Sequence, residues 1–299
     1  MASFVAPDVL VLAGGGVVGE AWMSGVLAGI EEESGVDLRA VESLVGTSAG
    51  SIVAARLAAG QSPRRPRSRK PTSSPEPEGE TDPARPVRGA LREIGRWGWA
   101  AAAPVAVPAT SLSAPAGALA RAAALRAAPA TGQSLGGLAR EVDASGARFD
   151  GRLRVCTVDK RTGKRVVFGA PGAPRAGVGQ AVAASCAIPW VFAPVSIGGR
   201  EYVDGGAWSV TNLDAAPARR DTQVLCLDPT GGRSGVLFAA FRVGVAVELQ
   251  LLRTRGARVR HVTPDAAAME AMGPNFMARA TVRPALAAGF AQGRALGGV

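Results

Sequence analysis

The chain has 299 residues, which suffices for one large α/β domain or two small ones, and 47% of its residues are apolar. Its net charge of +10 is unevenly distributed, with a basic block at residues 64–70 followed by an acidic block at 76–82. No aromatic residues alternate with these charges to stack on bases, so we expect no nucleic acid partner.

Three widely spaced cysteines, Cys156, Cys186 and Cys226, form neither a disulfide framework nor a metal-ligand pattern. We therefore expect reduced, buried thiols, no metal and no cofactor, which favours the cytoplasm. The N-terminus lacks the pattern of a secretory signal. Residues 236–252 are apolar but interrupted by charges, so the sequence predicts a buried helix there rather than a membrane span.

Residues 9–13 are a short apolar run, typical of a buried parallel strand. The run leads into a glycine-rich turn, residues 14–19, and a helical pattern over residues 20–32. Such a turn exposes backbone N–H groups and suits an anion. Two functions fit it, a dinucleotide site and an oxyanion hole. The dinucleotide fingerprint requires a second strand that ends in an acidic residue.

The second strand is predicted over residues 41–45, and it ends in Gly46-Thr47-Ser48-Ala49-Gly50 before a helical run at 52–59. Gly-x-Ser-x-Gly between a strand and a helix is the pattern of a nucleophile elbow, in which strained backbone holds the serine hydroxyl above the sheet. A Cβ on either glycine would crowd this turn. The helix that begins here directs N–H groups at developing negative charge. A simple glycine-rich turn is the alternative.

Residues 61–88 are rich in Pro, Ser, Arg and Glu, and they carry too little apolar surface to order, so we expect a disordered insertion. From 89 to 147 the pattern is helical but irregular. With Trp97 and Trp99, this segment could form an apolar lid or a membrane-surface patch. Ordinary helices packed on the core are the alternative.

The remaining chain alternates between strand and helix patterns. The predicted elements are helices at 119–128 and 135–142, a hairpin of 153–159 and 165–168, a helix at 177–185, strands at 200–203 and 223–227, a helix at 236–252, a strand at 259–262, a helix capped by Asp265 that ends at Met272, and a terminal helix at 276–296. Asp204 follows a strand and precedes two glycines, so its side chain can reach over the sheet edge, although Asp-Gly is also a common turn pair.

A serine hydroxyl needs a base before it can attack a carbonyl. The single histidine, His261, could complete a Ser–His–acid triad. The other candidate is Asp204 acting alone. A desolvated carboxylate within hydrogen-bond reach of Ser48 could accept the proton on attack and return it to the leaving alcohol.

Three motifs follow one another along the chain: Gly14-Gly15-Gly16-x-x-Gly19, Gly46-Thr47-Ser48-Ala49-Gly50 and Asp204-Gly205-Gly206. Together with residues 184–194 and Asn212, they resemble the patatin-like phospholipase family over residues 8–213. Val18 stands where that family commonly carries Arg or Lys, so the resemblance implies no preference for a phospholipid headgroup.

The resemblance implies Ser48 as nucleophile, Asp204 as base, and the N–H groups of Gly14, Gly15 and Gly16 as the oxyanion hole. It implies a single domain with an α/β fold, a three-layer α/β/α sandwich around a mainly parallel sheet. The implied activity is hydrolysis of lipid acyl esters without a metal, in a cytoplasmic protein that could touch a membrane surface.

Three other functions stay open at this point. The same residues would serve a carboxylesterase or thioesterase on soluble acyl substrates. The loop from Gly14 to Gly19 would serve a dinucleotide-binding protein. The basic block, with Trp97 and Trp99, would serve a catalytically idle membrane-surface module. Oligomeric state is not indicated by the sequence.

Overall fold

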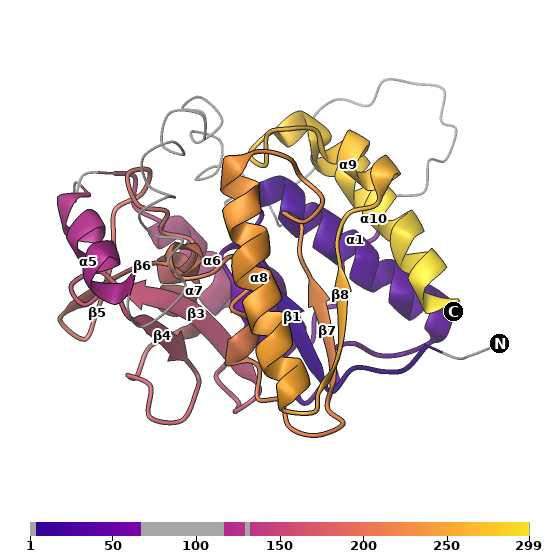
Figure 1. Ribbon diagram of the computed structural model, residues 1–299, viewed down its shortest axis with the longest axis horizontal. Coiled ribbons are helices and arrows are strands. Elements are labelled where there is room, and N and C mark those ends of the chain that lie inside the picture. Colours follow the sequence, from indigo (N-terminus) through magenta and orange to yellow (C-terminus); the bar gives the residue numbers. More distant parts are fainter. Residues whose placement is uncertain (1–3, 67–116, 129–131, 299) are drawn as a thin grey trace.

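A computed structural model describes residues 4–66, 117–128 and 132–298 of the chain (Figure 1). The strands are β1 (Val9–Leu12), β2 (Ser43–Thr47), β3 (Leu153–Asp159), β4 (Arg165–Phe168), β5 (Val195–Ile197), β6 (Arg200–Asp204), β7 (Gln223–Leu227) and β8 (Arg258–Val262). The α-helices are α1 (Gly16–Ser34), α2 (Ala49–Ala58), α5 (Ala118–Ala127), α6 (Gly136–Ala144), α7 (Val178–Ser185), α8 (Val236–Thr254), α9 (Ala266–Met272) and α10 (Val282–Gly297).

The strands of the described residues form one sheet in the order β5-β6-β3-β2-β1-β7-β8, with β4 also paired to β3. Four strand pairs are parallel: β3 with β2, β2 with β1, β1 with β7, and β7 with β8. The pairs of β3 with β4, β3 with β6 and β5 with β6 are antiparallel. Parallel strands are normally covered on both faces, and their sequences are apolar throughout. Strand β1, Val-Leu-Val-Leu, is fully buried in this way.

The two faces of the sheet carry separate cores because side chains alternate along a strand. Leu10 and Leu12 belong to the larger core, with residues of α1, α2, α6, α7, α9 and α10. Val9 and Val11 belong to a smaller core, with Leu252 of α8. The prediction of a three-layer α/β/α sandwich around a mainly parallel sheet is therefore confirmed (Figure 1).

Helix α1 is buried on two sides, because the sheet covers its inner side and α10 covers its outer side. Glycines allow this close approach. A Cβ on Gly25 would lie 2.3 Å from the Leu286 carbonyl oxygen, and a Cβ on Gly289 would lie 2.4 Å from the Trp22 carbonyl oxygen. The two helices are thus in backbone contact.

Two helix predictions are wrong in detail. Helix α8 was expected to be buried, but Val243 and Val247 are 66% and 59% exposed, because only the opposite face of α8 packs against the sheet. The terminal helix was expected from residue 276, but α10 begins at Val282. The Phe276 carbonyl instead accepts the N–H of Val18, so this segment crosses the start of α1. Strand β5 was not predicted.

The expected insertion and lid lie mostly outside the described residues. Residues 67–116, which contain Trp97 and Trp99, and residues 129–131 are not described. At the start of the insertion, Arg64 and Arg65 form ion pairs with Glu20 and Glu32 of α1. The helices predicted at 119–128 and 135–142 are confirmed as α5 and α6. Among the described residues, no helix has both the length and the apolarity that a bilayer span requires.

Candidate active site

Two strands meet end to end along one side of β3. Strand β2 pairs with the first part of β3, up to Cys156, and β6 pairs with its last part, from Thr157. Strand β4 occupies the other side of β3. Thr47 therefore lies opposite Cys156, and Asp204 lies opposite the next residue along. Since Ser48 directly follows Thr47, the serine and the aspartate come from two strands that point at each other.

The turn at Ser48 has strained backbone. Ser48 has φ 51° and ψ −123°, a region that L-residues other than glycine rarely occupy, at a cost of order 1–3 kcal/mol. A Cβ on Gly50 would lie 2.0 Å from the Leu12 carbonyl oxygen, and one on Gly46 would lie 2.5 Å from Ser51 Cα. The predicted strand–turn–helix with two obligatory glycines is confirmed.

Hydrogen bonds hold the backbone of Ser48 on both sides. Its N–H donates to Ser185 Oγ at 2.8 Å, and the Ser185 hydroxyl donates to the Cys156 carbonyl at 2.7 Å. Its carbonyl accepts the Ser51 hydroxyl at 2.6 Å. Ser185 is fully buried at the end of α7. This supporting role was not predicted, although Ser185 lies in a segment that carries the family resemblance.

Asp204 is 4% exposed and lies next to the Ser48 hydroxyl. Its Oδ1 accepts the N–H of Gly206 at 2.7 Å. Burial raises the pKa of Asp204 to about 7, while hydrogen bonds from Gly206 and from the Ser48 side chain work in the opposite direction. A carboxyl group with a pKa near neutrality is well suited to accept and return a proton.

The thiol of Cys186 also lies against this pair. Burial, followed by the charge of Asp204, raises its pKa, whereas the side chains of Ser51 and Ser48 act in the opposite direction. A thiol with a raised pKa remains protonated at neutral pH and is a poor nucleophile. Cys186 is therefore not an alternative nucleophile. It forms part of the apolar surroundings that desolvate Asp204.

The glycine turn between β1 and α1 lies against Ser48, since a Cβ on Gly14 would lie 3.5 Å from Ser48 Cβ. The N–H of Gly14 donates to the Val210 carbonyl at 2.9 Å. Within the part of the chain that the structure describes, the N–H groups of Gly15 and Gly16 donate to no acceptor. Gly15 and Gly16 thus have N–H groups available in this turn, and that of Gly14 is already engaged.

A further available donor was not predicted. Ala49 is the first residue of α2, and its N–H has no acceptor among the described residues. The first N–H groups of a helix have no partner within the helix and point toward negative charge. The position after the nucleophile in Gly-x-Ser-x-Gly could have revealed it, because this residue supplies such a donor in nucleophile elbows.

Asn212 links the two halves of the site. It is fully buried, and its Nδ2 donates to Thr47 Oγ1 at 3.1 Å, to the Gly205 carbonyl at 3.3 Å and to the Ser209 carbonyl at 2.6 Å. Thr47 precedes the serine and Gly205 follows the aspartate. One amide group therefore ties the two turns together.

Behind Asn212 lies a buried polar cluster that the sequence did not predict. Glu248 of α8 accepts a hydrogen bond from the Thr211 hydroxyl at 2.6 Å, and Arg165 forms a bidentate ion pair with Asp214. Burial and the neighbouring Asp214 raise the pKa of Glu248. The spacing of these charged residues along the chain does not indicate that they form pairs. Only Glu248 stood out in the sequence, because it interrupts an apolar run.

His261 is not brought to Ser48. It lies on β8, three strand positions from β2 in the sheet, or about 14 Å at ~4.8 Å per strand. Its Nε2 lies 3.2 Å from Asp228 Oδ2. A Ser–His–acid triad would require His261 at the serine, so this geometry leaves Asp204 as the candidate base.

Comparison with known proteins gives one family. The model of the family "Patatin-like phospholipase" matches residues 10–217. No curated protein matches the chain. Among solved structures, the chain is similar to VipD from Legionella pneumophila, at 14% identity and a TM-score of 0.44, over 98% of this chain and 67% of that one. It is also similar to the type III effector protein ExoU, at 16% identity and a TM-score of 0.37, over 98% of this chain and 53% of that one.

Proposed function

Because the chain belongs to the patatin-like phospholipase family, we propose that it hydrolyses lipid acyl esters through Ser48 and Asp204 and an acyl-enzyme intermediate. Family membership supports acyl hydrolase activity on lipids in general. One observation carries the assignment of residues. Ser48, on strained backbone at the end of β2, faces the buried Asp204 at the end of β6, and the Ser48 side chain is close enough to act on the pKa of that carboxyl group, which is about 7.

In the first half of the reaction, ionised Asp204 accepts the proton of Ser48 as Oγ attacks the ester carbonyl. The carbonyl oxygen becomes an oxyanion, which accepts hydrogen bonds from the N–H groups of Gly15, Gly16 and Ala49. Asp204 then gives the proton to the leaving alcohol oxygen, and the acyl group stays on Ser48. In the second half, Asp204 deprotonates a water molecule as it attacks the acyl carbon, and then returns that proton to Ser48 Oγ as the ester bond breaks and the fatty acid leaves.

The fixed backbone donors and the desolvated base supply most of the rate. One oxyanion donor is typically worth ~10²–10³ in rate, because it is aimed in advance at the developing charge. Aspartate is ordinarily a weak base, and burial makes Asp204 stronger. The hydrogen bonds of Ser185 and Asn212 hold the turns without occupying the proton-transfer path.

Labelling with a fluorophosphonate probe tests these roles. We expect Ser48→Ala to abolish labelling, because the attacking oxygen is removed, and Asp204→Asn to reduce it nearly to zero, because the base is removed. His261→Ala should label like wild type. Circular dichroism checks that each variant is folded. Labelling of folded Ser48→Ala, or its loss in folded His261→Ala, would contradict the dyad.

A soluble acyl ester is the competing substrate class, with the same catalytic residues. The two classes differ in the response to aggregation of the substrate. With a short-chain ester, activity should rise sharply as the substrate passes its micelle concentration if lipid interfaces are the natural target. A smooth, saturating response through that concentration would favour a soluble substrate.

A further inference from the structure

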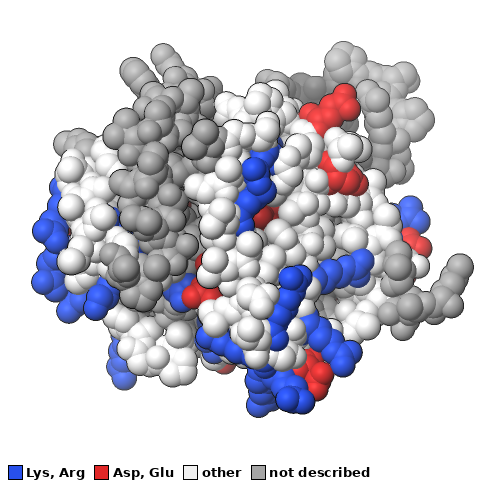
Figure 2. Space-filling model, in the orientation of Figure 1, with Lys and Arg blue, Asp and Glu red and all other residues white. Residues whose placement is uncertain are grey.

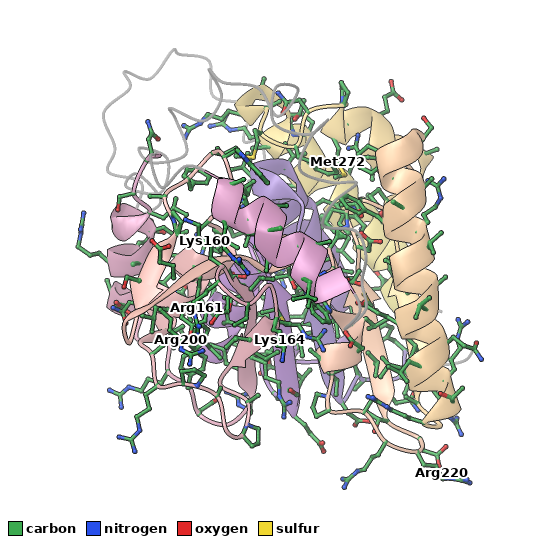
Figure 3. The ribbon with its side chains drawn as sticks, turned by 60° about the vertical axis from the view of Figure 1, so that its left-hand side comes forward. Lys160, Arg161, Lys164, Arg200, Arg220 and Met272 are labelled. Atoms are coloured by element: carbon green, nitrogen blue, oxygen red, sulfur yellow. The ribbon has the colours of Figure 1, made fainter. Side chains whose placement is uncertain are left out.

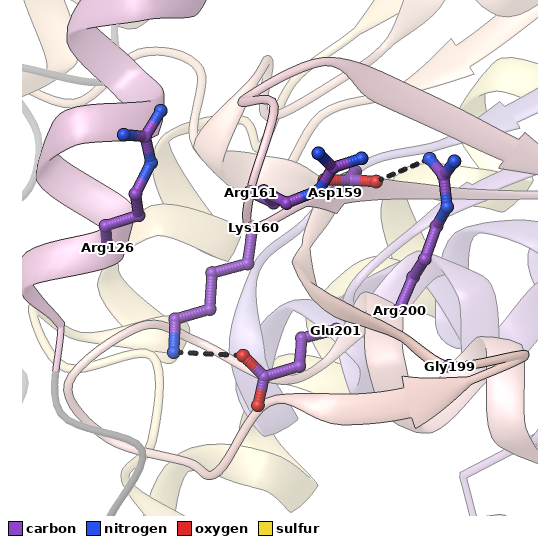
Figure 4. A pocket seen from close by; sticks show the side chains of 7 residues that line it. All are labelled: Arg126, Asp159, Lys160, Arg161, Gly199, Arg200 and Glu201. Atoms are coloured by element: carbon purple, nitrogen blue, oxygen red, sulfur yellow. Dashed lines mark hydrogen bonds and ion pairs between the residues drawn. The ribbon is translucent and has the colours of Figure 1, made fainter.

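A charged cavity lies beyond the end of β3, separate from the serine and the aspartate. Its volume is about 350 Å³, and it is lined by the last turn of α5, the β3–β4 turn and the β5–β6 turn (Figure 4). Its charged lining residues are Arg126, Asp159, Lys160, Arg161, Arg200 and Glu201. Figure 2 shows a group of Lys and Arg side chains at the α5 end of the molecule.

Two ion pairs fix part of this lining. Arg200 lies 3.2 Å from Asp159, whose side chain is 3% exposed and also accepts the N–H of Thr162 at 2.8 Å. Lys160, with a side chain 10% exposed, lies 3.3 Å from Glu201. A side chain held in this way loses less conformational freedom when a ligand binds, so the buried members, Asp159 and Lys160, are preorganised, whereas the side chains of Arg200 and Glu201 are 56% and 50% exposed.

The remaining two cations are uncompensated. Arg126 and Arg161 are exposed and make no hydrogen bond or ion pair within the described residues. Four cationic and two anionic side chains line the cavity, which leaves a surplus of two positive charges. Guanidinium groups match the geometry of phosphate oxygens, because each can donate two parallel hydrogen bonds.

Charge and volume together define the ligand. A phosphate monoester carries a charge of about −1.5 to −2 at pH 7, which matches the surplus. The volume lies within the range of about 300–1,000 Å³ found for small-molecule sites and leaves room beyond a phosphate. The partly exposed Glu201 carboxylate can accept hydrogen bonds from hydroxyl groups. We propose that this cavity binds a phosphate monoester carried on a small hydroxyl-bearing group, either free or as a lipid headgroup.

The position of the cavity relates it to the dyad. Arg200 and Asp204 are the first and last residues of β6, so they are separated by about 13 Å at ~3.3 Å per residue. A lipid whose headgroup phosphate enters the cavity would be held at the catalytic edge of the sheet. The placement of a lipid for hydrolysis rests on the proposed function of Ser48, whereas the binding of a phosphate monoester in the cavity does not.

Binding is tested with the full chain carrying Ser48→Ala, so that no hydrolysis interferes. Calorimetric titration compares inositol monophosphate with inositol and with inorganic phosphate. The test variant is Arg126→Ala/Arg161→Ala. The control is Arg219→Ala/Arg220→Ala, which removes the same charge just before β7, and Figure 3 shows Arg220 well away from Lys160, Arg161 and Arg200.

We expect inositol monophosphate to bind and inositol not to bind. The test variant should weaken binding about tenfold or more, as expected for the loss of charge-assisted hydrogen bonds, and the control should bind like wild type. Equal weakening in both variants would reduce the effect to general charge attraction and overturn the proposal. So would binding of inorganic phosphate as tight as that of inositol monophosphate, since the organic group would then add nothing.

Vesicles separate the two sources of the ligand. Phosphatidylcholine vesicles containing phosphatidylinositol monophosphate are compared with vesicles of equal charge containing phosphatidylserine. Preferential sedimentation with the former, displaced by inositol monophosphate, assigns a lipid headgroup, whereas titration without that preference assigns a soluble phosphate. Equal sedimentation with both vesicles, together with no titration, overturns the proposal. Fluorophosphonate labelling of Arg126→Ala/Arg161→Ala should stay at the wild-type level, so the cavity and the dyad can fail independently.

Discussion

In two adjacent units, β1–α1 and β2–α2, a buried parallel strand turns sharply into a helix, and each turn contains a residue with positive φ. In the first turn that residue is Gly16, at φ 58°, and in the second it is Ser48, at φ 51°. Nearly the same φ angle is therefore adopted by a glycine in the first turn and by a serine in the second. The first turn therefore offers backbone N–H donors, and the second offers a hydroxyl at the cost of strain.

The two turns also differ in what surrounds them. In the second turn, a Cβ on Gly50 would meet the backbone of the neighbouring strand, at Leu12. In the first turn, Cβ atoms on Gly15 and Gly16 would meet Pro229, Phe276 and Met277, from segments late in the chain. The second turn is thus fixed by the sheet itself, whereas the first is closed by segments outside the sheet. Substitutions should cost more stability in the second turn and mainly activity in the first.

The largest effect is expected from Gly50→Ala. Its Cβ would lie 2.0 Å from the Leu12 carbonyl oxygen, so strand and helix must separate. Overpacking typically costs about 1–3 kcal/mol, and a backbone clash of this depth should exceed that. We expect a large fall in melting temperature and no probe labelling. The control is Gly136→Ala, also near the start of a helix, where the nearest atom is 3.4 Å away. Equal melting temperatures for the two variants would contradict the comparison.

Gly16→Ala should leave the protein folded and lower kcat/KM about 10²–10³-fold, because displacement of the turn removes an oxyanion donor. The Cβ would lie 2.7 Å from the Phe276 carbonyl oxygen, which belongs to the segment between α9 and α10 and not to the sheet. Gly35→Ala is the matched control, since Gly35 has φ 71° with no atom within 4 Å and shares the torsional strain alone. Esterase kinetics and thermal melts measure both. Wild-type activity in Gly16→Ala would exclude this turn from catalysis.

Ser185→Ala should lower kcat by about tenfold with little change in KM, because the N–H of Ser48 would lose its buried acceptor, a penalty of about 1–3 kcal/mol. Ser145→Ala is the control, since that hydroxyl also lies at a helix end and donates to a carbonyl, of Val142, but not at the site. A matched loss of kcat in both variants would indicate a general destabilisation rather than support of the serine.

A dependence on pH belongs to the second turn alone, because only Ser48 has a titrating partner. Burial raises the pKa of Asp204 to about 7, so the carboxyl group is protonated and inactive as a base below that pH. We expect kcat/KM to increase with pH and to level off above about 7. Stability should change in the opposite sense. The folded state binds this proton more tightly than the unfolded state, so the unfolding free energy falls as pH rises from about 4 to about 7. An activity profile that is flat between pH 5 and 8 would exclude Asp204 as the base.

Both turns and most strand boundaries could be predicted from the sequence, because they depend on contacts within a few residues. The hairpin of β3 and β4 has the predicted bounds. Asp265 caps α9, as expected, by accepting the N–H of Ala268. Glycine spacing revealed the two turns, since a missing Cβ is a local requirement. Ser48 and Asp204 could be named as candidates for this reason, but their proximity could not.

What the local pattern left undetermined was set by the pairing of distant segments. Strand β6 takes the place beside β3 where β2 ends, and this brings Asp204 to Ser48. The same packing engages the N–H of Gly14 with Val210 and ties the two turns through Asn212. It leaves one face of α8 exposed. Such contacts depend on which surfaces meet when the sheet assembles. They join residues far apart in the chain, and the local sequence periodicity does not indicate which distant residues will be in contact.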